Sequence, residues 1–432
     1  MRRKYLGVMV QDDRVIATYL IESPYSVEQA AEVLAGEQST GTFIAVPGET
    51  EELKERYRTK VLSIELLEES SMPAFPQPPA LTSGHYSRSR VTVSIPFEMV
   101  GSDLTTLLAS VLGNVYELKE VSALRLIDLE LPPAFLERCA MPRFGVEGTR
   151  ALADVQGRPL IGAVVKPSVG LQPEAFAQRV QVLAEAGADF IKDDELMADA
   201  PYCRFEARVQ AVMRVVHDVA QCTGRKPMVA FNITGDIDSM MRRHDVVQAA
   251  GGNCVQVNLN QAGLVAVSYL RRQGALAIHG HAAGWGLTSR QAWFGLDFKV
   301  YALIWRLVGI DQLVTIGLDS KFWPTNDASL GAMRECLTAI RSEADRVMPA
   351  VGSKQWGGQA PAMVAAMGSP DVIYLAGAGI FGHPGGPAAG VTAIRQAWEA
   401  ALAGIPLVSY AAEHRELAQS IAAFGGTAQG DK

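Results

Sequence analysis

Short apolar runs alternate with longer helical patterns through most of the chain, and this alternation constrains the fold more than any other feature. The runs are rich in β-branched residues and lie near residues 160–165, 190–192, 228–231, 254–257, 276–279, 312–315, 348–351 and 372–375. Helical patterns fill the gaps, for example over residues 174–186, 204–219, 297–307 and 388–401. Eight strand–helix units in about 250 residues are typical of a TIM barrel. We therefore predict an α/β fold with a (β/α)8 barrel domain over residues 141–432.

The first 140 residues mix strands and helices without that regular alternation. Strand patterns cover residues 15–21, 42–46 and 90–95, and helical patterns cover 26–35 and 104–112. Such a mixture predicts a separate amino-terminal α+β (ferredoxin-like) domain over residues 1–140. The proline-rich segment 72–84 is interpreted as a loop inside this domain.

Composition excludes several classes of protein. The 432 residues are 48% hydrophobic and 20% charged, as in ordinary globular proteins. A net charge of −7 argues against nucleic acid or an anionic membrane as a partner, but a phosphorylated substrate needs only local positive charge. The five cysteines show no C-x-x-C spacing, so we expect no disulfide framework. No apolar stretch suits a signal sequence or a membrane span, and we expect a cytoplasmic protein.

A lysine and three carboxylates follow one another where the second barrel strand is predicted to end, at Lys192-Asp193-Asp194-Glu195. Side chains alternate along a strand, so Lys192 and Asp194 share one face and Glu195 follows at the turn. A buried lysine that loses its proton can capture CO2 as a carbamate, which would be an oxygen ligand beside Asp194 and Glu195. Three such ligands suit Mg²⁺. For an isolated segment of this kind a solvated turn is the simpler interpretation, so the surrounding sequence has to decide.

The surrounding landmarks favour the metal site. In chain order they are residues 37–43 (E-Q-S-T-G-T-F), 113–115 (G-N-V), 157–160 (G-R-P-L), 165–167 (V-K-P), the Lys192 segment, 278–279 (I-H), 317–321 (G-L-D-S-K) and 377–384 (G-A-G-I-F-G-H-P). Together they resemble the RuBisCO superfamily over roughly residues 15–400. The resemblance implies a magnesium enzyme with a carbamate on Lys192 and an active site at the carboxyl ends of the barrel strands.

The resemblance also implies roles for residues outside the metal site. Lys166, at the mouth of the first barrel strand, would be an acid/base group. Glu37 and Asn114 would act across a homodimer in which the amino-terminal domain of one chain caps the barrel of the other. His279 ends the fifth predicted strand; we favour contact with substrate, although a histidine in this position is often a satisfied core residue. His281 is a weaker candidate of the same kind.

A phosphate site is the second predicted constellation. The backbone of Gly377 and Ala378 lies between a strand and a helix, where N–H groups can hold an anion. A glycine-rich loop alone often marks only a tight turn, but its place near the end of the barrel favours phosphate. The resemblance implies further donors from Thr42 and Lys321. Lys354 would add positive charge there or point to solvent.

Departures from the family pattern narrow the reaction. Where carboxylases carry K-P-K, H-R-A-M-H, a strand-six histidine and S-G-G, this chain has Ser168, Gly280 with Ala283, Val314 and residues 352–354 (G-S-K). The lost arginine and histidine serve the second phosphate of a bisphosphate. We therefore expect a substrate with one phosphate, and a RuBisCO-like protein that is not a carboxylase.

An enediolate intermediate is common to the reactions that such a site could still perform. We favour a decarboxylase of 3-oxo-isoapionate 4-phosphate, or a transcarboxylase/hydrolase of the same substrate, because residues 352–356 are polar and cationic. The alternatives are a 5-methylthioribulose-1-phosphate isomerase and a diketo-methylthiopentyl-phosphate enolase. A binding protein without catalysis is a more remote alternative, since Lys192, Asp194 and Glu195 are all intact.

Overall fold

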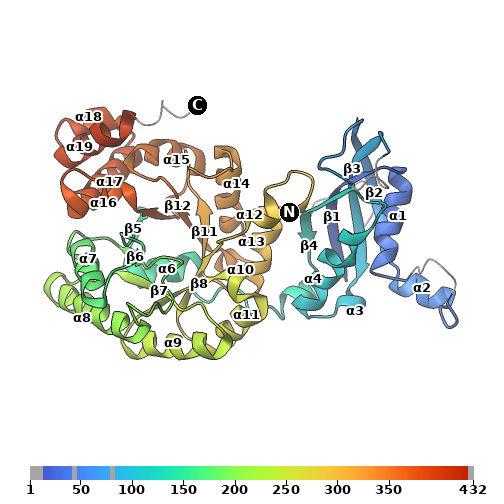
Figure 1. Cartoon of the computed structure of the whole chain (residues 1–432), viewed down its shortest axis with the longest axis horizontal. Coiled ribbons are helices and arrows are strands. Elements are labelled where there is room, and N and C mark those ends of the chain that lie inside the picture. Colours follow the sequence, from blue (N-terminus) through green and yellow to red (C-terminus); the bar gives the residue numbers. More distant parts are fainter. Residues whose placement is uncertain (1–12, 41–45, 78–82, 427–432) are drawn as a thin grey trace. The chain divides into compact units, whose positions relative to one another are not determined.

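The computed structural model describes residues 13–40, 46–77 and 83–426, and the chain forms two compact units (Figure 1). The amino-terminal unit comprises Met1–Cys139 together with Trp285–Ile304. The barrel unit comprises Ala140–Gly284 and Trp305–Lys432. The sequence pattern did not indicate that a segment following the fifth barrel strand belongs with the amino-terminal unit.

A five-stranded sheet organises the amino-terminal unit. Its order is β10-β4-β1-β3-β2, from Gly295–Leu296, Ala123–Glu130, Arg14–Ser23, Tyr86–Pro96 and Lys60–Ser70. β10 is parallel to β4, whereas the other neighbours are antiparallel. The short segment 285–304 joins this unit because β10 continues its sheet. The α+β prediction is confirmed, although the sequence patterns did not include β2 or β4.

Helices of this unit are short. They are α1 (Val27–Glu37), α2 (Glu51–Tyr57), α3 (Phe97–Val100), α4 (Leu104–Leu112), a 3-10 turn (Asn114–Glu117), α5 (Pro133–Leu136) and α12 (Gly286–Ser289). The hydroxyls of Ser26 and Thr50 accept hydrogen bonds from the first turns of α1 and α2, as N-caps do. The buried Tyr19 of β1 donates to the carbonyl of Val111 at 2.9 Å and so fixes the end of α4. The predicted strand 42–46 lies mostly outside the described residues.

Eight parallel strands close into a barrel in the second unit, which confirms the predicted TIM-type fold. They are β5 (Leu160–Val164), β6 (Phe190–Lys192), β7 (Met228–Asn232), β8 (Cys254–Asn258), β9 (Ala277–His281), β11 (Gln312–Ile316), β12 (Met348–Gly352) and β13 (Ile373–Ala376). Every predicted run lies within two residues of one of these strands. β9, however, ends at His281 and not at His279.

Helices surround the barrel strands (Figure 1). They are α6 (Gly145–Ala153), α7 (Pro173–Glu185), α8 (Phe205–Thr223), α9 (Ile237–Ala249), α10 (Leu259–Ala262), α11 (Leu264–Gln273), α14 (Asn326–Leu337), α15 (Ala360–Met367), α16 (Ala378–Phe381), α17 (Gly386–Leu402), α18 (Leu407–Ala411) and α19 (Arg415–Phe424). One further helix, α13 (Phe298–Leu307), begins in the amino-terminal unit and ends in the barrel unit. Within the described ranges no helix is both long and apolar enough to cross a membrane.

Apolar side chains fill the barrel interior at the amino ends of the strands. Leu160, Phe190, Met228, Met348 and Ile373 come from five different strands, and all are fully buried. Burial of such side chains contributes about 25 cal/mol per Å² of apolar surface, so this layer stabilises the barrel.

Close packing of α17 on α16 requires a glycine. A Cβ atom added at Gly390 would lie 2.4 Å from the carbonyl oxygen of Ile380 and 2.7 Å from its Cα atom. Both atoms belong to backbone, which cannot move aside as a side-chain tip can. Gly390 thus fixes the position of α16, the short helix that follows the glycine-rich loop at Gly377.

We predict opposite effects for the same substitution at two helical glycines. Gly390→Ala should lower the free energy of unfolding by about 1–3 kcal/mol, because the added methyl overpacks the α16–α17 contact. Gly331→Ala in α14 should raise it by about 0.4–1 kcal/mol, because nothing lies within 4 Å of the added Cβ atom and the unfolded chain loses entropy. Urea midpoints at constant m-value measure both. Equal effects at the two positions would contradict this account of α17.

Candidate active site

Four of the predicted site residues meet at the carboxyl ends of β5 and β6. Lys192 ends β6 and is 2% exposed; Asp194 is 5% exposed in the loop that follows. Glu195 Oε2 lies 3.8 Å from Lys192 Nζ. Lys166, two residues beyond β5, donates from Nζ to Asp194 Oδ2 at 3.2 Å and also to Ser168 Oγ. The two strands are held in register here because Val165 N donates to the carbonyl of Lys192 at 3.1 Å.

The surroundings lower the pKa values of both Lys192 and Asp194. Burial lowers the pKa of Lys192, although Glu195, Asp193 and Asp194 act in the opposite direction. Burial alone would raise the pKa of Asp194, but the hydrogen bond from Ser168 and the charge of Lys166 outweigh it and hold that pKa below its ordinary value. A lysine with a lowered pKa is more readily deprotonated, which is the form that reacts with CO2.

The resemblance implies a Mg²⁺ ion, and the side chains around Lys192 decide whether the site can hold it. The described residues contain no group of three His, Cys, Asp or Glu side chains suited to a metal ion. The cluster instead holds two carboxylates, Asp194 and Glu195, with the buried amine of Lys192 between strand and loop. A carbamate on this amine would complete a set of three anionic oxygen donors, which suits Mg²⁺. The residues therefore fit the metal only together with CO2.

Two asparagines that the sequence analysis did not select hold the backbone of these carboxylates. Asn232, at the end of β7, donates from Nδ2 to the carbonyls of Asp194 at 3.2 Å and Glu195 at 2.9 Å. Asn258, at the end of β8, donates to the Glu195 carbonyl at 2.8 Å. Thr234 Oγ1 links them, because it donates to Asn232 Oδ1 and accepts from Asn258 N. Because each asparagine directly follows a predicted barrel strand, its place in the sequence could have identified it as a site candidate.

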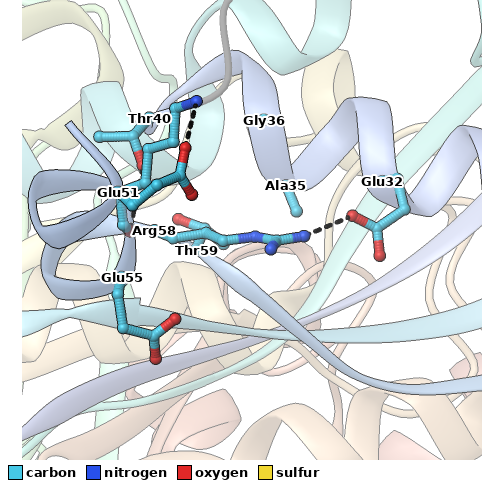
Figure 2. Close-up of a pocket in the computed structure, with 9 residues that line it drawn as sticks. Glu32, Ala35, Gly36, Thr40, Glu51, Glu55, Arg58 and Thr59 are labelled. Carbon is cyan, nitrogen blue, oxygen red and sulfur yellow. Dashed lines mark hydrogen bonds and ion pairs between the residues drawn. The ribbon is translucent and has the colours of Figure 1, made fainter. Parts of the chain in front are cut away.

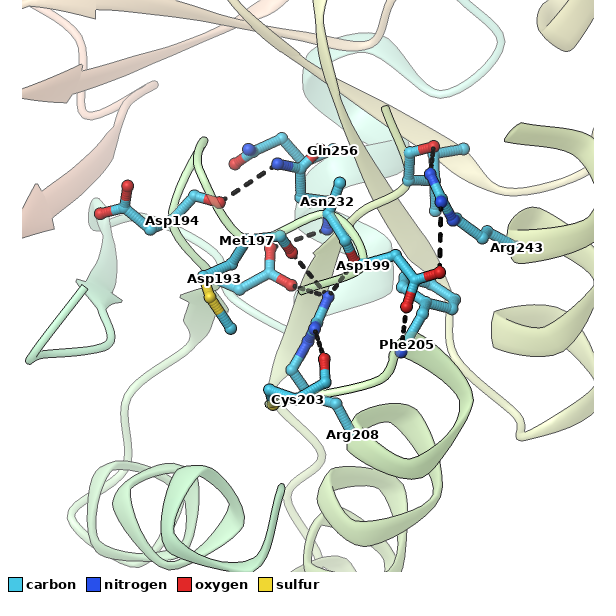
Figure 3. Close-up of polar contacts among 12 residues, drawn as sticks. Asp193, Asp194, Met197, Asp199, Cys203, Phe205, Arg208, Asn232, Arg243 and Gln256 are labelled. Carbon is cyan, nitrogen blue, oxygen red and sulfur yellow. Dashed lines mark hydrogen bonds and ion pairs between the residues drawn. The ribbon is translucent and has the colours of Figure 1, made fainter. Parts of the chain in front are cut away.

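A buried arginine fixes the rest of the loop (Figure 3). Arg208 of α8 is fully buried, and its guanidinium donates to the carbonyls of Met197, Ala198 and Cys203 at 2.7, 2.9 and 3.1 Å. It also pairs with Asp193 Oδ2 at 3.1 Å. Burial raises the pKa of Asp193 to about 6, against the charge of Arg208. Asp193 is therefore a supporting residue, whereas its neighbours face the site.

A second arginine joins this loop to the next one. Arg243 of α9 donates to the carbonyls of Ile233 at 3.3 Å and Thr234 at 2.7 Å, after β7. It also lies 3.5 Å from Asp199 Oδ2, an oxygen of the loop after β6. The ring of Phe205 lies against both guanidinium groups, at 5.3 Å from Arg208 and 5.9 Å from Arg243. The two loops consequently form one rigid support.

The two histidines of β9 have different surroundings. His279 is fully buried within the strand, with Nδ1 2.9 Å from Gln312 Oε1, and burial lowers its pKa to about 3. His281 lies two residues nearer the strand end, and its Nε2 is 3.6 Å from Glu195 Oε2. Its Nδ1 is buried without a hydrogen-bond partner in the described part of the chain. The structure thus places His281, and not His279, beside the carboxylates, because β9 is longer than expected.

The glycine-rich loop lies next to the acid/base candidate. Gly377 follows β13, and a Cβ atom there would be 3.1 Å from Lys166 Cε. Ala378 begins α16 and is exposed. A Cβ atom at Gly379 would lie 2.3 Å from the carbonyl oxygen of Gln355, which explains the second glycine. The loop therefore approaches the Lys166 side chain closely.

Lys321 and Lys354 occupy the loops after β11 and β12, and both are exposed. Lys321 N donates to Ser353 Oγ at 3.4 Å. The buried Gln355 joins the two loops, because its Nε2 donates to the carbonyls of Leu318 at 2.8 Å and Ser353 at 2.7 Å. Within the described residues no hydrogen bond or ion pair connects either lysine to the Lys192 cluster.

Glu37 and Asn114 belong to the amino-terminal unit, and both are exposed. The segments that carry them are adjacent, since a Cβ atom at Gly113 would be 3.2 Å from Gln38 Nε2. Thr42, the third predicted residue of this unit, lies outside the described residues.

Two cavities lie away from these residues. One of about 300 Å³ in the amino-terminal unit is lined by charged side chains that are largely paired, such as Arg58 with Glu32 at 3.2 Å (Figure 2). Another of about 700 Å³ in the barrel unit is lined by residues 235–238 and 262–266. None of the described site candidates lines either cavity.

Comparison with known proteins identifies the family. The ribulose bisphosphate carboxylase large chain profiles match residues 5–135 (N-terminal domain) and 145–424 (catalytic domain). The chain is 46% identical to a 3-oxo-isoapionate-4-phosphate decarboxylase of Rhizobium etli, covering 95% of this chain and 98% of that one. It is 48% identical to a 3-oxo-isoapionate-4-phosphate transcarboxylase/hydrolase of Xanthobacter autotrophicus, covering 91% and 95%.

Solved structures that are similar to this chain come from the same family. A RuBisCO-like protein from Burkholderia fungorum superposes with a TM-score of 0.89 at 42% identity, over 95% of this chain and 99% of that one. Dimeric and octameric RuBisCOs share the fold. The chain therefore belongs to the RuBisCO large-chain family, as one of its RuBisCO-like members.

Proposed function

We propose that this protein is a Mg²⁺-dependent decarboxylase of 3-oxo-isoapionate 4-phosphate. The observation that carries the proposal is the cluster at the ends of β5 and β6, where Lys166 donates to Asp194 beside the buried Lys192 and Glu195. This cluster offers a metal site and a proton donor next to each other. The names of relatives 46% and 48% identical to this chain support the substrate class.

In this proposal Lys192 (as its carbamate), Asp194 and Glu195 hold Mg²⁺. When bound, the metal would polarise the substrate carbonyl and stabilise negative charge on its oxygen. The bond between the carboxylate and its carbon breaks, CO2 leaves, and the electron pair enters the enediolate. Lys166 Nζ, whose proton is shared with Asp194 Oδ2 and Ser168 Oγ, then protonates the carbon that carried the carboxylate.

Phosphate and substrate binding complete the proposal. The backbone of Gly377 and Ala378, with Thr42 and Lys321, would hold the single phosphate, and Lys354 would add positive charge. The closeness of Gly377 to Lys166 supports a phosphate held near the proton donor. His279 was proposed to contact substrate; its full burial favours a role in shaping the barrel interior, and His281 is the better placed of the two.

We also propose a cytoplasmic homodimer in which Glu37, Thr42 and Asn114 of one chain complete the barrel site of the other. The exposed positions of Glu37 and Asn114 on adjacent segments of the amino-terminal unit support a shared role for the two residues. Division of the chain near residue 140 into a capping domain and a catalytic domain belongs to the same proposal.

A second candidate reaction is hydrolytic cleavage of the same substrate. It is favoured by one observation, the 48% identity to a protein named as a transcarboxylase/hydrolase. Both reactions use the same carbonyl, but decarboxylation breaks the bond to the carboxylate carbon, whereas hydrolysis adds water to the carbonyl and breaks the bond between the carbonyl carbon and its neighbour. They differ in whether the carboxyl group leaves as CO2 or remains on a carboxylic acid, so product analysis separates them.

We predict that Lys192→Ala lowers turnover by about a hundredfold or more, because the metal loses a ligand. Lys226→Ala, which removes an exposed lysine bonded only to the Gly251 carbonyl, should leave turnover unchanged. In the wild-type protein, preincubation with CO2 and Mg²⁺ should activate, and labelled CO2 trapped on the protein should disappear in Lys192→Ala.

Activation should increase with pH, since only the neutral amine reacts with CO2. Because burial lowers the pKa of Lys192, the rise should occur below the ordinary pKa of lysine, about 10.4. Full turnover in Lys192→Ala, or after exhaustive chelation, would contradict the metal site.

The reaction itself is tested by NMR of the product in D2O together with a CO2 assay. Decarboxylation of 3-oxo-isoapionate 4-phosphate should place solvent deuterium on the carbon that carried the carboxylate and release one CO2 per turnover. Formation of a carboxylic acid without CO2 would establish the hydrolase. Turnover of 5-methylthioribulose 1-phosphate would establish the isomerase, and ribulose 1,5-bisphosphate should give no labelled 3-phosphoglycerate from bicarbonate.

Mixing of two inactive variants tests the shared site. After subunit exchange, Asn114→Ala and Lys192→Ala should together recover about a quarter of wild-type activity, because half of the dimers hold one intact site. Asp194→Ala mixed with Lys192→Ala is the matched control and should recover none, because both changes lie in the barrel unit. No recovery in the first mixture, with heterodimers demonstrated, would place both groups in one chain's own site.

A further inference from the structure

Three arginines gather at the end of the barrel opposite to the candidate active site. Arg158 precedes β5, Arg225 precedes β7, and Arg395 lies on α17. The buried Asp189, which precedes β6, lies at their centre. Asp189 lies three residues before Lys192, and at about 3.3 Å per residue this places it about 10 Å along β6 from the Lys192 end of the strand.

Both carboxylate oxygens of Asp189 accept two hydrogen bonds, from two of these arginines and from the backbone. Its Oδ2 accepts from Arg158 Nη1 at 2.6 Å and from Ile161 N at 2.9 Å. Its Oδ1 accepts from Arg158 Nη2 at 2.9 Å and from Arg225 Nη2 at 2.7 Å. This carboxylate therefore balances one positive charge and has no oxygen left for Arg395.

The guanidinium groups of Arg225 and Arg395 converge over Gly187. A Cβ atom added there would lie 3.0 Å from Arg395 Nη2, 3.2 Å from Arg395 Nη1 and 3.2 Å from Arg225 Nη1. Arg395 Nη2 donates to the carbonyl of Gly187. The absence of a side chain at Gly187 thus lets the two guanidinium groups approach each other over its backbone.

The positive charges of these arginines are not fully balanced by acidic groups, and not all of their N–H groups form hydrogen bonds. Arg395 Nε is buried without a hydrogen-bond partner in the described part of the chain. Burial lowers the pKa of Arg395, and the charges of Arg158 and Arg225 lower it further, against Asp189 and Glu399. Glu399 is the other acidic group that acts on this cluster, and it is exposed and accepts from Tyr410 OH at 3.3 Å. Three cations thus face two anions, with free donors over Gly187.

We infer that Arg225 and Arg395 bind a phosphate group over Gly187, at the amino ends of the barrel strands. Two guanidinium groups with free N–H donors match the geometry of phosphate oxygens. Its bearer is inorganic phosphate or a small phosphate monoester. The inference does not rest on the proposed function, because none of its residues belongs to the Lys192 cluster or to the predicted phosphate loop at Gly377.

Isothermal titration calorimetry of the full chain with inorganic phosphate tests this site. At low ionic strength, with chloride as the control anion, Arg225→Gln should remove one phosphate per chain or weaken it at least tenfold. Arg225 is 48% exposed, so this variant should fold. Arg242→Gln is the matched control: Arg242 is 56% exposed and pairs only with Glu206 at 3.8 Å, and its loss should leave both stoichiometry and affinity unchanged.

A second titration with ribose 5-phosphate distinguishes the two sources. Tighter binding of the monoester than of inorganic phosphate, lost in Arg225→Gln, would identify a sugar phosphate as the ligand; the reverse order would identify inorganic phosphate. Lys321→Ala should retain the Arg225-dependent phosphate, which separates it from the proposed substrate site. Identical phosphate binding by Arg225→Gln and the wild type would overturn the inference, whatever the outcome for the decarboxylase.

Discussion

Removal of one lysine amine from water is the constraint on which the active-site end of the barrel depends. Lys192 is 2% exposed, and an ammonium group in such a place costs several kcal/mol unless its charge is balanced or lost. Burial lowers its pKa, and the neighbouring carboxylates act against that change. The same burial that destabilises the charged amine therefore favours its neutral form, which is the form that the proposed carbamate requires.

Supporting residues convert this local chemistry into a fixed geometry. Asn232 and Asn258 hold the carbonyls of the carboxylate loop, and Arg208 holds three further carbonyls of the same segment. These hydrogen bonds hold the backbone, so that the Asp194 carboxylate faces Lys166 and the Glu195 carboxylate faces Lys192 and His281. A buried charge such as Arg208 is tolerated because all of these acceptors are in place.

The amino ends of the strands use buried aspartates to join neighbouring strands. Asp189 accepts from the backbone of Ile161 and from Arg158, and Asp311 accepts from the backbone of Ile278 and from Arg271. Each aspartate thus connects its own strand to an adjacent strand and to a cation. Fixed strand ends on this side leave the loops at the opposite end to carry the residues of the candidate site.

The amino-acid sequence alone determined the barrel, the order of its strands and the segment from Lys192 to Glu195, because side-chain period and strand-end position are local properties. It did not reveal β2, which has mostly exposed side chains, or the sheet contact of β10, which spans distant segments. Only the tertiary structure decided that His281 lies beside Glu195 while His279 is buried, and that Arg208, Asn232 and Asn258 support the site. These arrangements depend on where eight strands end relative to one another, and that register is set by packing across the closed barrel.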